Sequence, residues 1–178
     1  MAVKTYTKGV STKLSANFES TEFDCHGSNC CSKTLIDEQL VKYLQQIRDY
    51  FGKPVVVSSA YRCSQHNKNI GGATRSRHIS GEAADIYING VAPAKIAQYA
   101  EYLGILGIGL YETNSDGHFV HIDTRTSKSF WYGQSEKYRS TFGGSDLKIE
   151  KTPTPTKPKE GEKGKMKYSE SNKPIICM

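Results

Sequence analysis

The first half of the chain contains apolar residues at helical spacing. Between Leu35 and Phe51 they are separated by four, three and four positions, at Leu40, Leu44, Ile47 and Phe51. Positions at these intervals fall on one face of a helix. We therefore expect a helix in this region that packs its apolar face on a hydrophobic core.

Short apolar runs after this helix are typical of strands, and one longer segment is typical of a second helix. Residues 92–103 are predicted to be helical, because Pro93 suits a first turn and Gly104 suits the position after a last turn. The predicted strands are residues 54–59, 83–88, 107–111 and 119–123. Together these elements predict an α+β domain with a small, mostly antiparallel sheet flanked by helices.

The composition changes near Leu147. Beyond this residue, Thr-Pro repeats and a mixture of Lys, Glu and Gly leave almost nothing apolar to bury. Such segments form linkers or disordered tails. We therefore predict a folded domain over residues 1–146 and a linker over 147–167, followed by a tail or the start of a second module over 168–178.

The positive charge is concentrated at the C-terminal end. From Lys151 onward, seven lysines and three glutamates contribute +4 of the net charge of +6. A nucleic-acid groove needs clustered basic and aromatic side chains on the folded surface, so we expect no nucleic-acid partner. No apolar run has the length of a signal-peptide core or a membrane span, so we expect cytoplasmic synthesis and no membrane insertion.

The chain has five cysteines, four of them before residue 64. An odd number with this distribution does not fit the disulfide framework of a small secreted domain. Cys25, Cys30 and Cys31 can bind a structural metal ion together with Cys63, but their spacing matches no common zinc knuckle. Of these two interpretations, we favour buried free thiols.

One motif carries candidate metal ligands. His78 and Asp85 are seven positions apart, and His121 lies in a later predicted strand. Two imidazoles and one carboxylate are a common ligand set for catalytic zinc, which keeps its fourth position open. Gly81, between the first two ligands, allows a tight turn of the backbone.

The full pattern resembles a known family. Ser76-Arg-His78-Ile-Ser-Gly81-Glu-Ala83-Ala-Asp85, with the downstream Phe-Val-His121-Ile-Asp, is similar to the zinc D-alanyl-D-alanine carboxypeptidases and L-alanyl-D-glutamate endopeptidases, which include many bacteriophage endolysins. The resemblance extends from about residue 14 to residue 131. It implies a zinc ion bound by His78, Asp85 and His121, on a sheet that carries the metal on one face. It also implies that Arg62 holds a substrate carboxylate and that Ser76 contacts the substrate.

The catalytic base departs from the family pattern. Many members have Glu or Asp three residues before the last zinc histidine, where this chain has His118. The ordinary pKa of histidine suits a base at neutral pH, so His118 is the first candidate. In a regular strand His118 would point away from the face of His121, and a loop or bulge at Gly117 would then be required. Asp116 is the second candidate.

The resemblance implies hydrolysis of peptide bonds next to D-amino acids in peptidoglycan stem peptides, by a carboxypeptidase or an endopeptidase. Two alternatives stay open: a non-catalytic, zinc-containing module that binds the cell wall, and a D,D-dipeptidase. We expect a monomer that reaches the wall after lysis or export. The sequence leaves open which peptide bond is cut.

Overall fold

The computed structural model describes residues 2–112, 117–133 and 137–147. The chain divides into two units, Met1–Leu147 and Lys148–Met178, and only the first contains described residues. Apart from Leu147, the linker and tail predicted from the sequence therefore lie outside the described residues. The helical elements are η1 (Ser20–Phe23), α1 (Glu38–Phe51), α2 (Ser64–Asn69), α3 (Pro93–Tyr102) and η2 (Gly144–Asp146).

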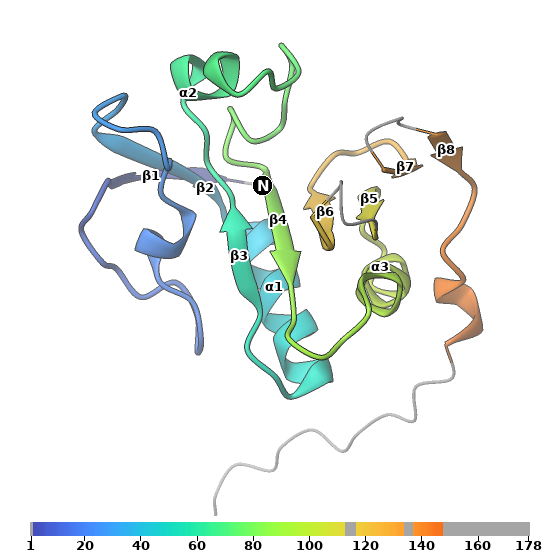
Figure 1. Ribbon diagram of the computed structural model, residues 1–178. Coiled ribbons are helices and arrows are strands. Elements are labelled where there is room, and N and C mark those ends of the chain that lie inside the picture. Colours follow the sequence, from blue (N-terminus) through green and yellow to red (C-terminus); the bar gives the residue numbers. More distant parts are fainter. Residues whose placement is uncertain (1, 113–116, 134–136, 148–178) are drawn as a thin grey trace, which may run out of the picture. The chain divides into compact units, whose positions relative to one another are not determined.

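Six strands form the main sheet, in the order β3-β4-β6-β5-β7-β8 (Figure 1). Their bounds are β3 (Val56–Ser59), β4 (Ala83–Tyr87), β5 (Gly107–Tyr111), β6 (Phe119–Asp123), β7 (Ser129–Tyr132) and β8 (Lys137–Arg139). Every neighbouring pair is antiparallel except β5 and β7, which are parallel. The predicted α+β fold with a mostly antiparallel sheet is confirmed.

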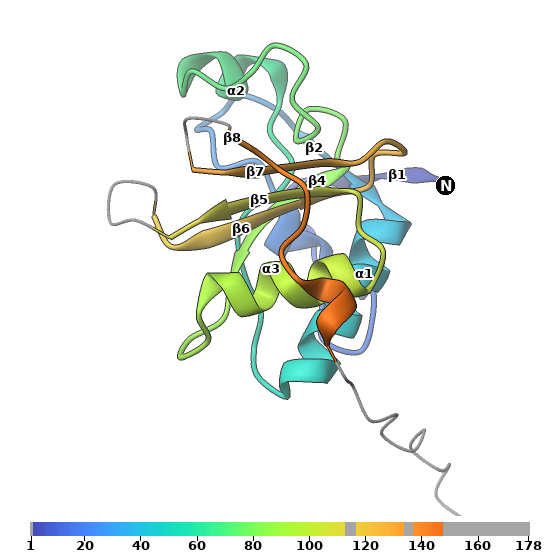
Figure 2. The same cartoon turned by 90° about the vertical axis from the view of Figure 1, so that its right-hand side faces the viewer.

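One face of the main sheet is apolar and buried. Ile86, Ile108 and Ile122 on three adjacent strands are fully buried, as is Ile96 of α3. Figure 2 shows α1 and α3 on one side of this sheet and α2 on the other. Side chains alternate between the two faces of a strand. The residues that directly precede and follow each of these isoleucines along its strand therefore point to the opposite face of the sheet, where the polar groups lie.

The N-terminal region forms a separate antiparallel pair, β1 (Val3–Thr7) and β2 (Lys33–Asp37). The first predicted helix therefore begins later than expected, at Glu38, and Leu35 belongs to β2. The reason is a cap: the Asp37 side chain accepts a hydrogen bond from Gln39 N at 2.9 Å, which satisfies a free N–H of the first helical turn.

The apolar face predicted for α1 is buried at Leu40, Leu44 and Ile47. Its last residue, Phe51, is only half-buried, and Gly52 then ends the helix in a left-handed conformation. Among the described residues, no helix combines the length and the apolar character needed to cross a membrane.

Gly81 lies in the loop before β4 and brings this loop into close contact with β2. Its φ of +75° is left-handed, and a Cβ at this position would lie 2.3 Å from the carbonyl oxygen of Leu35. The Gly81 carbonyl also accepts a hydrogen bond from Asp37 N at 2.9 Å. Glycine is therefore required for the close approach that fixes the loop between His78 and Asp85.

Candidate metal centre

The site is built on one row of residues that crosses the main sheet. Ser59 pairs with Asp85, Asp85 with His121, His121 with Gly109, and Gly109 with Trp131. Paired residues on neighbouring strands present their side chains to the same face. The sheet register therefore places Asp85 and His121 side by side, opposite the apolar core.

His78 completes a group of three potential metal ligands. Nδ1 of His121 lies 2.9 Å from Oδ1 of Asp85 and 3.2 Å from Nε2 of His78, and Nε2 of His78 lies 3.3 Å from the same carboxylate oxygen. The three side chains are almost fully buried, with exposed fractions of 3% for His78, 6% for Asp85 and 9% for His121. Two imidazole nitrogens and one carboxylate oxygen in mutual contact fit the ligand preference of zinc.

The orientation of His78 is fixed by the backbone. Its Nδ1 lies 2.6 Å from the carbonyl oxygen of Ala60, so this nitrogen carries the proton and donates it. Nε2 is then the unprotonated nitrogen, and it faces Asp85 and His121. Burial lowers the pKa of His78, which favours the neutral imidazole that binds metal ions.

The orientation of His121 is fixed by a carboxylate on the same strand. Nε2 of His121 lies 3.2 Å from Oδ2 of Asp123, which is fully buried. The guanidinium of Arg125 in turn donates to both oxygens of Asp123, at 2.8 Å and 2.6 Å. A histidine ligand whose second nitrogen contacts a carboxylate is a common support of zinc sites. This role of Asp123 was not predicted from the sequence, although the His-x-Asp spacing places both side chains on one face of the strand.

The protonation states of the three candidate ligands depend strongly on one another. Burial alone would lower the pKa of His121, but hydrogen bonds to Asp123 and Asp85 outweigh it and raise the pKa to about 9. Burial would raise the pKa of Asp85, yet contact with the two histidines holds it well below its ordinary value. The metal-free site is thus ionised, and a divalent cation has to displace a proton from His121.

Arg62 and Ser76, the predicted substrate-binding residues, both line the same cavity as the three ligands. Nη2 of Arg62 lies 2.5 Å from Oδ2 of Asp85, and Nε donates to Ser59 Oγ at 2.8 Å. The structure therefore pairs Arg62 with a predicted metal ligand. Ser76 Oγ accepts a hydrogen bond from the backbone N–H of His78 at 3.4 Å.

The cavity has a volume of about 650 Å³ and a basic, partly aromatic lining. Arg75, Arg77 and Arg125 line it in addition to Arg62, whereas Asp85 is the only acidic residue among the described lining residues. Tyr111, Phe119 and Trp131 also line it. Such a cavity suits a ligand that carries carboxylates.

Trp131 was not identified as a site residue from the sequence. Its ring centroid lies 5.1 Å from that of His121, and its Nε1 donates to Tyr111 Oη at 2.9 Å. Gly109 makes this position possible, because a Cβ there would lie 2.4 Å from the indole ring. The parallel pairing of β7 with β5, which no local pattern indicates, brings Trp131 to the site.

The two candidate bases are placed differently. His118 directly precedes β6 with a left-handed φ of +50°, and it lines a second cavity with Tyr87 and Pro93. It does not belong to the described lining of the cavity that contains the ligands. Asp116 lies outside the described residues.

Three protein ligands beside an open cavity are the arrangement of catalytic zinc, since structural zinc is held by four ligands. A sequence model of the family Peptidase M15 matches residues 16–123, which is well over half of the chain and includes all three candidate ligands. The chain therefore belongs to the peptidase M15 family.

Two curated relatives match a shorter region. The chain is 36% identical over 96 residues to a zinc D-Ala-D-Ala carboxypeptidase of Streptomyces albus G, which covers 52% of this chain and 36% of the relative. It is 34% identical over 96 residues to the peptidoglycan L,D-endopeptidase MepK of Escherichia coli K12, which covers 50% of this chain and 51% of the relative. The chain thus spans about half or less of the length of these relatives.

Proposed function

We propose that the chain is a zinc-dependent peptidase that cuts peptide bonds next to D-amino acids in peptidoglycan stem peptides. The observation that carries the proposal is the buried contact of His78, Asp85 and His121 at one cavity. Membership of the peptidase M15 family supports it, as do two relatives named for a D-Ala-D-Ala carboxypeptidase and a peptidoglycan endopeptidase.

His78 Nε2, His121 Nδ1 and a carboxylate oxygen of Asp85 would hold the zinc ion. When bound, zinc supplies Lewis acidity toward the scissile carbonyl and activates a water molecule for attack. Ala60 and Asp123 keep the two imidazoles in the required orientation.

The basic lining of the cavity is proposed to bind the carboxylates of the stem peptide. Arg62 has the planar guanidinium that pairs with carboxylates through two hydrogen bonds, and Ser76 lies beside it in the lining. Tyr111, Phe119 and Trp131 form an aromatic group that can pack against the aliphatic part of the peptide. We propose that the chain acts as a monomer.

Proton transfer from the attacking water to the leaving amine needs a base. We propose His118, which stands where many family members have Glu or Asp, or Asp116 for this role. Among the described residues that line the cavity, none besides the three ligands is a histidine or a carboxylate. His118 therefore has to turn toward the cavity, or Asp116 has to reach it.

That same observation favours a second candidate function, a non-catalytic module that retains the zinc site and binds the cell wall. A module without an effective base would still bind peptide through the basic cavity. A D,D-dipeptidase is a further alternative, which would differ from the proposed peptidase only in its substrate.

One assay separates these functions. The purified chain is incubated with a synthetic stem peptide ending in D-Ala-D-Ala and, separately, with the free D-Ala-D-Ala dipeptide, and the products are identified by mass spectrometry. We expect cleavage of the stem peptide, loss of cleavage with a chelator, and recovery with added zinc. His118→Ala or Asp116→Ala, whichever removes the base, should slow the reaction about 10²–10⁴-fold.

Binding of intact stem peptide without any cleavage in the presence of zinc would support the wall-binding module and contradict the peptidase. Cleavage of the free dipeptide alone would identify the dipeptidase. Asp146→Ala, the same substitution outside the described lining of the cavity, is a matched control for Asp116→Ala and should leave the rate unchanged.

A further inference from the structure

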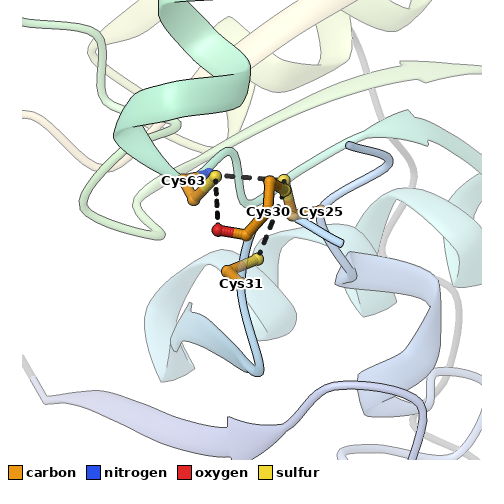
Figure 3. A group of neighbouring side chains, drawn as sticks. All are labelled: Cys25, Cys30, Cys31 and Cys63. Carbon is orange, nitrogen blue, oxygen red and sulfur yellow. Dashed lines mark hydrogen bonds between the residues drawn. The ribbon is translucent and has the colours of Figure 1, made fainter. Parts of the chain in front are cut away.

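Four of the five cysteines meet at one point, away from the candidate catalytic site. Cys25, Cys30 and Cys31 come from the loop between η1 and β2, and Cys63 is the N-cap residue of α2. The four sulfur atoms all lie within 4.8 Å of one another, with 3.5 Å between Cys25 and Cys30 and 3.7 Å between Cys30 and Cys31. Figure 3 shows the four side chains turned toward a common centre.

We propose that Cys25, Cys30, Cys31 and Cys63 bind a second metal ion, a structural zinc. Four sulfurs held about 2.3 Å from a tetrahedral zinc ion are about 3.8 Å apart, close to the separations found here. Four thiolates without an open position are a structural ligand set, and this chemistry selects zinc over the harder divalent cations.

Packing of free thiols, which the sequence favoured, explains this arrangement less well. Cys25 and Cys63 are buried, but Cys30 and Cys31 are only partly buried, so burial alone does not account for their inward orientation. The sequence spacing did not favour this site, because Cys63 lies 32 positions after Cys31 and reaches it only through the fold.

Two of the four sulfurs accept hydrogen bonds from backbone N–H groups. The backbone N–H of Cys63 donates to Cys25 Sγ, and the N–H of His66 donates to Cys63 Sγ, both at 3.4 Å. Hydrogen bonds of this kind stabilise metal-bound sulfur. Lys8 Nζ donates to the Gly27 carbonyl at 3.0 Å, which places a cation beside the loop that carries three of the thiols.

The loop is also shaped closely around the sulfurs. A Cβ on Gly27 would lie 2.5 Å from Cys30 Sγ and 3.0 Å from the His66 side chain. Only glycine therefore allows the chain to pass between the cluster and α2.

The position of the cluster indicates what the ion does. Cys63 directly follows Arg62, and the N–H of Arg62 donates to the His78 carbonyl at 3.1 Å. Tyr61 N donates to the Phe23 carbonyl, also at 3.1 Å. A metal ion bound to Cys63 and to the loop after η1 thus cross-links the N-terminal region to the segment that carries Arg62.

The test is the metal content of the full 178-residue chain, purified without oxygen. The wild-type protein should contain about two equivalents of zinc, and His78→Ala and the double variant Cys30→Ser/Cys31→Ser about one each. Cys177→Ser is the matched control, because it removes the one cysteine outside the cluster, and it should retain both equivalents. Circular dichroism checks that each variant is folded.

Cobalt identifies the ligands and also decides the question if the cysteine variants fail to fold. His78→Ala and the wild type both retain the four cysteines, and after loading with cobalt both should show an intense thiolate-to-cobalt charge-transfer band. Absence of that band in the wild type would overturn the proposal, as would a chain mass that lacks two or four hydrogens because of disulfides. Neither result would affect the zinc bound by His78, Asp85 and His121, so this proposal and the proposed function fail independently.

Discussion

At the scale of single residues, the three candidate zinc ligands depend on neighbours that never contact the metal. The Ala60 carbonyl sets the tautomer of His78, and Asp123 contacts the distal nitrogen of His121. Arg62 and Arg125 compensate the two buried carboxylates, Asp85 and Asp123. The site is therefore oriented before any ion enters it.

Asp123→Asn tests this support. Loss of the charged partner should weaken zinc binding at the His78 site roughly 10–100-fold, measured by competition with a chromophoric chelator. In the metal-free protein it should also lower the pKa of His121 from about 9, measured by NMR titration of the imidazole. An unchanged pKa would show that Asp123 does not stabilise the protonated ring.

The same shift predicts a pH dependence of stability. The pKa of His121 in the folded, metal-free chain lies above its ordinary value of 6.5, so its contribution is fully present below pH 6.5 and is lost as the pH rises toward 9. The melting temperature of the chelator-treated protein should therefore fall across this range, and less so for Asp123→Asn. An equal fall in both proteins would assign the effect to other groups.

At the scale of elements, the sheet register assembles the site. Two strands agree with the prediction from sequence to the residue, β5 at 107–111 and β6 at 119–123. Their bounds were predictable because β-branched or apolar residues are flanked by glycines or polar residues. β1, β2, β7 and β8 were not predicted, since short or polar strands depend on pairing with distant segments.

Gly109→Ala tests the register of β5 against β7. The added methyl group would meet the Trp131 ring at 2.4 Å, so the variant should lose about 1–3 kcal/mol of unfolding free energy in denaturant titrations. Trp131→Ala provides the matched background. In this variant, Gly109→Ala should lower the unfolding free energy only slightly. An equal cost in both backgrounds would show that Trp131 does not lie over Gly109.

At the scale of the whole molecule, one short segment contributes to both the candidate metal centre and the cysteine cluster. Residues 60–63 contribute the carbonyl that orients His78, the guanidinium that contacts Asp85, and one of the four clustered sulfurs. The grouping of His78, Asp85 and His121 could be predicted because they lie in one recognisable motif and one strand. From the sequence, the cysteine cluster was the less favoured of two interpretations and the position of Trp131 was not predicted, because both arise from contacts between segments far apart in the sequence.

The most direct test of the central claim is an anomalous difference map from crystals of the zinc-loaded protein, with data collected on either side of the zinc absorption edge. The account predicts a peak about 2.0–2.2 Å from His78 Nε2, His121 Nδ1 and a carboxylate oxygen of Asp85. Zinc-loaded crystals with no peak between these three residues would contradict it.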